Sequence, residues 1–205
     1  MSTVVPPRSV PGSSRSWFPR LARGPGWLVL AGLLWLGGPA TGRAAEPVSK
    51  EYQLKAAYLY NFTKFVEWPE QGFNDTQSPI VIGILGRNPF GDELDKIVRD
   101  RAVNGRAIRI VLITTAEEVR MVHLLFVPAG EEGHPAFAAA LAQHPGVLTV
   151  GESAPYAAGG GVITFTPVGD KLRFTINLEA AEGAGLKVSA QLLKLATVVR
   201  RQPGS

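Results

Sequence analysis

A glycine-rich turn is the one pattern in this chain that has the form of a ligand site. Gly83 and Gly86 lie in and just after the apolar run Ile80–Leu85, and Arg87 and Asn88 follow. A turn between a strand and a helix can bind an anion through its backbone amides, and ligands of parallel sheets bind at the carboxyl ends of strands. The spacing differs from G-x-G-x-x-G, and no Walker lysine follows. We interpret the glycines mainly as turn formers and keep Arg87 and Asn88 as candidate ligand contacts.

Other reactive residue types lack the spacing of a catalytic or metal-binding site. The three histidines, His123, His134 and His144, show neither H-x-H nor H-E-x-x-H spacing. Ser153 lies in G-E-S-A-P, which is not the G-x-S-x-G of a hydrolase nucleophile elbow. The chain has no cysteine, so it contains no disulfide, thiol nucleophile or cysteine metal ligand. We therefore expect no catalytic residue, no metal and no cofactor.

Two asparagines interrupt apolar patterns. Residues 51–68 are predicted to form a helix that Pro69 ends, and Asn61 falls on its apolar stripe. The other members of that stripe are Leu54, Ala57, Tyr58, Phe65 and Trp68, with Phe62 at its margin. A buried amide needs hydrogen-bond partners, so Asn61 either bonds to neighbouring backbone or lines a ligand or partner surface. Asn177, near the end of an alternating strand, is the second such candidate.

Hydrophobic periodicity predicts the elements that position these residues. Four apolar runs are expected as strands: 80–85, 107–113, 122–127 and 147–150. Helices are expected between them: one from Pro89, capped by Asn88, to about residue 100, one with a Thr115–Glu118 capping box, and one over 134–143. Strands that alternate with helices predict βαβ units and a mostly parallel sheet covered on both faces.

The C-terminal part is predicted in most detail. Residues 172–178 alternate apolar and polar side chains, and Gly169-Asp170 before them forms a two-residue hairpin loop. The apolar cross-strand pairs are Pro167–Leu172, Phe165–Phe174 and Ile163–Ile176, and the opposite face pairs Thr164 with Thr175 and Thr166 with Arg173. Ser189 is expected to cap a final packing helix.

Together these elements predict a single three-layer α/β domain. Its sheet has roughly six strands, mostly parallel, flanked by helices and completed by the C-terminal antiparallel hairpin. We expect a doubly wound arrangement, flavodoxin-like or like half of a solute-binding protein.

The first 45 residues have the composition of an export signal. They contain five arginines, no acidic residue and the apolar run Trp27–Leu36, followed by small residues. We expect cleavage between Gly42 and Ala45; the alternative is an uncleaved anchor, although the run is well short of the ~20 residues that span a bilayer. The domain would then cover residues 46–201, with a short tail at 202–205.

Removal of this leader changes the charge balance of the chain. The whole sequence has 21 Lys+Arg and 17 Asp+Glu, and subtracting the five leader arginines leaves 16 against 17. A net charge of about −1 offers no excess of positive charge for phosphate backbones. Binding to nucleic acid is therefore disfavoured.

Two motifs resemble those of a known family. They are Y-N-F-x-K-F-V-E-W-P over residues 60–69 and GG-V-I-x-F … L-x-F-x-I-N-x-x-A-A-x-x-A-G-L-x-x-S-x-x-L-L-x-L-A over residues 160–196. Both resemble the YfiR family of bacterial periplasmic proteins. The resemblance implies a non-enzymatic regulator that binds and restrains the periplasmic part of an inner-membrane diguanylate cyclase or a related sensor, and so controls cyclic-di-GMP signalling.

The resemblance also implies an outer-membrane-associated partner that relieves the restraint, and formation of a homodimer. The best-known members carry disulfide-forming cysteines, which this chain lacks. The alternative function is a periplasmic solute-binding domain serving a transporter or sensor, with Asn61, Arg87, Asn88 or Asn177 lining its pocket.

Overall fold

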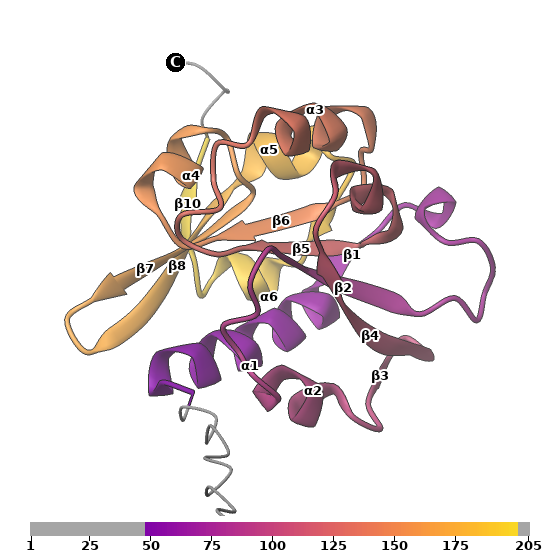
Figure 1. Ribbon diagram of the computed structural model, residues 1–205, viewed down its shortest axis with the longest axis horizontal. Helices are drawn as coiled ribbons and strands as arrows, with labels where there is room; N and C mark the ends of the chain where they lie inside the picture. Colours follow the sequence, from indigo (N-terminus) through magenta and orange to yellow (C-terminus); the bar gives the residue numbers. More distant parts are fainter. Residues whose placement is uncertain (1–47, 201–205) are drawn as a thin grey trace, which may run out of the picture. The chain divides into compact units, whose positions relative to one another are not determined.

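The computed structural model describes residues 48–200, which form helical layers on both faces of a twisted sheet (Figure 1). The main sheet has eight strands in the order β10-β8-β7-β6-β5-β2-β4-β3, and β1 pairs with β9 separately. The strands are β1 (Val66–Glu67), β2 (Ile80–Leu85), β3 (Ala102–Val103), β4 (Arg106–Ile113), β5 (Leu124–Val127), β6 (Leu148–Gly151), β7 (Ile163–Val168), β8 (Lys171–Asn177), β9 (Lys187–Val188) and β10 (Thr197–Val199).

The helices of this part of the chain differ widely in length. They are α1 (Lys50–Phe65), α2 (Glu93–Val98), α3 (Pro135–Gln143), α4 (Ala154–Ala158), α5 (Leu178–Gly183) and α6 (Ala190–Leu193), with the short 3-10 helices η1 (Glu70–Gly72) and η2 (Ala116–Met121). Helix α1 is the longest and lies along one face of the sheet, with α2 beside it (Figure 1). No helix within residues 48–200 is long and apolar enough to cross a membrane.

The parallel part of the sheet confirms the doubly wound prediction. Strands β4, β2, β5, β6 and β7 are adjacent and parallel, which is the flavodoxin-like strand order 2-1-3-4-5. Strand β8 is antiparallel to β7, and β10 is parallel to β8. The expected six strands were too few, because four strands of only two or three residues each, β1, β3, β9 and β10, fall below what periodicity can detect.

Two cores pack against the two faces of the sheet. The larger core lies beneath α1 and includes Phe62, Phe126, Phe165 and Ile176. The smaller core packs η2 and α3 against the opposite face, where Leu125 and Val127 are buried. Strands β2 and β5 are covered on both sides, which explains their almost unbroken apolar sequences.

The C-terminal hairpin has the predicted register throughout. Val168 pairs with Lys171, Phe165 with Phe174, and Thr164 with Thr175. Strand β6 pairs with β7 only at Ile163 and Thr164. Pro167 therefore lies beyond the β6 pairing, where its missing amide hydrogen interrupts no ladder. The tip of the hairpin projects from the body of the domain (Figure 1).

Two predictions about helices were wrong. The buried face of α1 is formed by Lys55, Ala56, Leu59, Phe62 and Thr63, about one residue away from the predicted stripe. The half-exposed Asn61 and the 44% exposed Leu54 therefore lie outside that buried face. The cause is Lys55, which takes a position in the core that hydrophobic periodicity assigns to apolar residues.

The other error concerns the residue at which a helix begins. Asn88 caps a turn, since its Oδ1 accepts from the Phe90 amide at 2.8 Å, and α2 begins only at Glu93. Ser189 does cap a final helix, but α6 has only four residues, and the chain then returns to the sheet as β10. The β-branched sequence of Thr197–Val199 favours a strand over a continued helix. The predicted signal peptide and the tail lie outside the described residues.

A stack of side chains holds the connection between α1 and β2 over the amino ends of the strands. The Arg106 guanidinium lies 3.8 Å from the centre of the Phe73 ring, which stacks on His123 at 4.4 Å. The His123 Nδ1 accepts from the Val81 amide, and its Nε2 donates to the Gly72 carbonyl, both at 3.0 Å. These bonds require the neutral ring, so His123 has a structural role.

Burial, and less strongly the charge of Arg106, lower the pKa of His123 below 6.5. Below pH 6.5 the unfolded chain binds a proton that the folded chain does not. The free energy of unfolding should therefore decrease as the pH is lowered, by up to about 1.4 kcal/mol per pH unit. Urea unfolding between pH 5 and 7.5 measures this slope. We expect His123→Gln to reduce it, whereas His134→Gln, at an exposed position, should not. Equal slopes in all three proteins would contradict the assignment.

Candidate functional site

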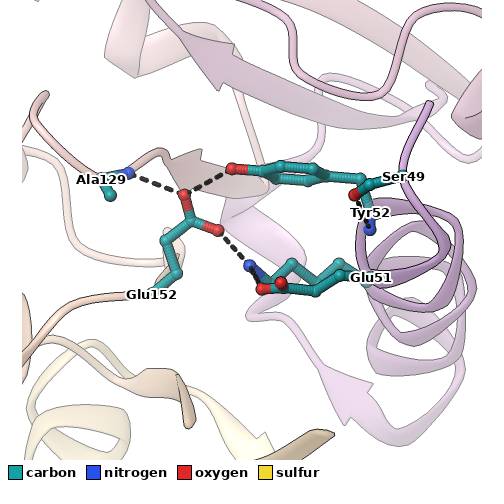
Figure 2. Close-up of polar contacts among 6 residues, drawn as sticks. Ser49, Glu51, Tyr52, Ala129 and Glu152 are labelled. Atoms are coloured by element: carbon teal, nitrogen blue, oxygen red, sulfur yellow. Dashed lines mark hydrogen bonds and ion pairs between the residues drawn. The ribbon is translucent and has the colours of Figure 1, made fainter. Parts of the chain in front are cut away.

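A buried carboxylate organises the carboxyl edge of the parallel strands. Glu152 follows β6, and its Oε1 accepts hydrogen bonds from the Tyr52 hydroxyl at 2.9 Å and from the Ala129 amide at 2.8 Å (Figure 2). Its Oε2 accepts from the Lys55 ammonium at 2.5 Å. Three segments that are far apart in sequence, the start of α1 and the loops after β5 and β6, therefore meet at one carboxyl group.

The Lys55–Glu152 ion pair is almost entirely removed from water. The side chains of Lys55 and Glu152 are 5% and 4% exposed, respectively. Lys55 also contacts the carboxylate of Glu51 one helical turn earlier, at 2.5 Å, and that carboxylate is 52% exposed. The Lys55 ammonium lies 4.5 Å from the centre of the Tyr52 ring, a cation–π distance. A charge buried at this depth is tolerated because several partners share it.

The side chains of this cluster hold the start of α1 in position rather than act as reactive groups. Burial and the hydrogen bond to Glu152 raise the pKa of Tyr52 to about 12, so its hydroxyl stays protonated and continues to donate. Both Glu152 oxygens are engaged, and Lys55 is shared between two carboxylates. The arrangement fastens the first turns of α1 to the loops of the sheet.

The glycine turn after β2 is in contact with a carboxylate of the same chain, that of Glu131. Gly86 has φ +65°, and a Cβ placed on it would collide with the carboxyl group of Glu131. The carboxylate thus lies against the turn at the point where β2 and β5 diverge, which is the ligand position in doubly wound sheets. A second anion there would meet the negative charge of Glu131, and this disfavours the phosphate-type binding considered from the sequence.

The structure does not bring the four sequence candidates together. Arg87 and Asn88 are exposed at the carboxyl edge of the parallel strands. Asn177 ends the antiparallel strand β8, so it lies at the opposite edge, where its Oδ1 accepts from the Ala180 amide at 3.3 Å. Asn61 is half-exposed in the last third of α1. A ligand or partner role for any of them stays a prediction, and one small molecule does not contact all four.

Sequence reasoning missed the Lys55–Glu152 pair. The two residues are separated by 97 positions, and each is of a type that is usually solvated. Their only sequence signal is positional: Lys55 lies one residue from a predicted apolar stripe, and Glu152 directly follows a buried strand. Within residues 48–200 no group of three or more histidine or acidic side chains could hold a metal ion.

Substitution of the buried pair should show that it acts as a unit. Lys55→Met leaves Glu152 buried without its cation, and we expect it to lower the free energy of unfolding by about 3–5 kcal/mol. Addition of Glu152→Gln, whose amide still accepts from Tyr52 and Ala129, should recover part of that loss. Lys64→Met, on the exposed side of α1, is the matched control. Additive losses in denaturant unfolding would show that the two side chains are not coupled.

Comparison with known proteins identifies the family of the chain. The YfiR/HmsC-like family model (DUF4154) matches residues 52–197. No curated protein matches the chain. Among solved structures, the ABC domain in complex with L-Trp from Streptococcus pneumonia is 15% identical, has a TM-score of 0.40, and is matched over 58% of this chain and 55% of that one. We draw nothing from a likeness at that level. The family match, in contrast, includes both motifs and every strand of the sheet except the last two residues of β10, and the chain belongs to the YfiR/HmsC-like family of periplasmic regulators.

Proposed function

We propose that this protein is a non-enzymatic periplasmic regulator that binds the periplasmic part of an inner-membrane diguanylate cyclase, or of a related sensor, and restrains it. The observation that carries this proposal is the family match over residues 52–197. An outer-membrane-associated partner that relieves the restraint, and self-association of the chain, are further parts of the proposal.

The polar chemistry of the domain supports a binding role over a catalytic one. Its most buried carboxylate and ammonium neutralise each other, and Tyr52 is held protonated by burial and by Glu152. Its structural histidine uses both ring nitrogens in hydrogen bonds to backbone. Groups that are fully committed to internal bonds are poor nucleophiles and poor general bases. Such bonds instead give a rigid body that can present a fixed surface to a receptor.

Restraint of a receptor requires only preferential binding to its inactive state. A ligand shifts a two-state equilibrium by the difference between its affinities for the two states. The described surface offers apolar side chains for such contact. The large apolar residues exposed on it are Leu54, Leu112, Met121, Val168, Leu195 and Val198. Leu195 and Val198 lie close together in sequence around the edge strand β10, where a protein partner could bury both.

Deletion of the gene should raise cellular cyclic-di-GMP, because the cyclase loses its restraint. Complementation with the full chain should restore the lower level. The matched control is the same chain without residues 1–45, which should stay in the cytoplasm and fail to complement although it is expressed. Cyclic-di-GMP is quantified by mass spectrometry of cell extracts, under conditions in which the protein is detected. An unchanged level on deletion would contradict the proposal, and a cytoplasmic chain that complements would contradict the periplasmic site of action.

A further inference from the structure

No helix within residues 48–200 lies over one face of the C-terminal hairpin. Ile163, Phe165, Phe174 and Ile176 point to the core beneath α1. On the opposite face, α3 packs over the centre of the sheet, and α4 reaches only the start of β7. The helices of the described residues therefore leave the outer parts of β7 and β8, and β10 beside them, uncovered. Strand alternation places Thr164, Thr166 and Thr175 on this open face.

A pocket of about 230 Å³ lies on this face between α4 and β10. It is lined by Ala157, Gly161, Val162, Thr164, Thr166, Thr175, Asn177 and Val199. At about 30 Å³ per liquid water molecule, its volume corresponds to about eight waters. This is smaller than the ~300–1,000 Å³ typical of sites for drug-sized ligands. A monosaccharide or a short polyol is of suitable size, whereas a nucleotide or a peptide is too large.

The chemistry of the lining selects among small molecules. Among residues 48–200, no residue that lines the pocket carries a charge, so a charged ligand would lose its hydration without gaining a counter-charge from them. Three threonines line the pocket, and none of their hydroxyls has a hydrogen bond to another group within residues 48–200. Each hydroxyl can both donate and accept, which matches the hydroxyl groups of a sugar or polyol.

The spacing of the hydroxyls supports the same class of ligand. Thr164 and Thr175 are directly opposite each other on β7 and β8, and Thr166 is two positions further along β7. Directly opposed Cβ atoms in an antiparallel pair are about 5 Å apart, and residues two apart on a strand are about 7 Å apart. The methyl groups of the threonines, with Ala157, Val162 and Val199, provide apolar contacts for the C–H groups of such a ligand.

We propose that the pocket on the outer face of β7, β8 and β10 binds a small neutral polyhydroxylated molecule, a monosaccharide or a linear polyol, through the hydroxyls of Thr164, Thr166 and Thr175. This inference does not depend on the proposed cyclase partner. It gives the domain a separate site through which a periplasmic solute can bind.

Equilibrium binding to the full exported protein tests this site. Isothermal titration calorimetry with glycerol, xylitol, D-ribose, D-glucose and myo-inositol should show saturable binding of at least one compound. D-Gluconate and D-glucosamine, the charged comparators, should bind at least tenfold more weakly than the best neutral compound. Thr166→Val and Thr175→Val keep the shape of the side chain and remove one hydroxyl, and each should weaken binding about fivefold.

Two further variants separate a bound ligand from a general effect of substitution. Thr197→Val is the matched control, because Thr197 pairs with Thr175 on the neighbouring strand but does not line the pocket. It should bind as the native protein does. Ala157→Leu should fill the pocket and abolish binding while the protein unfolds at a similar temperature.

Three results would overturn the inference: no saturable binding by any neutral compound, equal binding of the charged comparators, or binding that survives both threonine substitutions. Cyclic-di-GMP after gene deletion is measured independently. The two experiments therefore distinguish a protein that regulates cyclic-di-GMP without binding the ligand from a protein that binds the ligand without regulating cyclic-di-GMP.

Discussion

Docking of α1 along the sheet is the contact on which the rest of this structure depends. At its middle, the Phe62 ring lies 5.8 Å from Phe165 and 5.2 Å from Phe174, and Tyr58 lies 5.4 Å from Phe174. Aromatic pairs of this geometry contribute about 0.5–1.5 kcal/mol each beyond the area that they bury. The helix thereby joins the C-terminal hairpin to the parallel strands, which precede that hairpin in sequence.

The two ends of this contact are fixed by polar bonds that act in different ways. At the carboxyl edge of the sheet, Lys55 and Tyr52 converge on Glu152, and removal of either charge leaves the other buried. At the amino edge, the Trp68 indole donates to the His123 carbonyl at 2.9 Å, and the His123 ring holds the loop that follows. The apolar middle supplies most of the free energy of docking, whereas the polar ends select one register of the helix.

The sequence predicts those parts of the fold whose cause is local. The hairpin register follows from strict alternation around Gly169-Asp170, and all six of its pairs are as expected. The buried strands and the Thr115–Glu118 capping box follow from equally short-range patterns. The predicted rotation of α1 about its own axis was wrong, because the observed rotation depends on Lys55, whose partner Glu152 is 97 residues away. Strand β10 was missed because three residues are too few to show an alternating pattern, although their β-branched side chains favour the strand that pairs with β8.

The same distinction explains how much of the candidate sites could be predicted. The turn at Gly86 was identified, but its occupant, the carboxylate of Glu131, comes from another loop and cannot be inferred from the turn itself. The threonine face of the hairpin was also visible as cross-strand pairs, because alternation alone determines which side chains share a face. Whether a helix covers that face depends on where α3 and α4 end, which is a property of the assembled sheet. Sequence therefore predicts which groups lie on a surface more readily than it predicts whether that surface is open.

In this domain the open surface lies on the opposite face of the hairpin from α1. A ligand or partner bound there contacts strands whose other side packs against the α1 core. Phe165 and Phe174 then connect the bound face to α1, and the pairing of β7 with β6 connects it to the parallel strands.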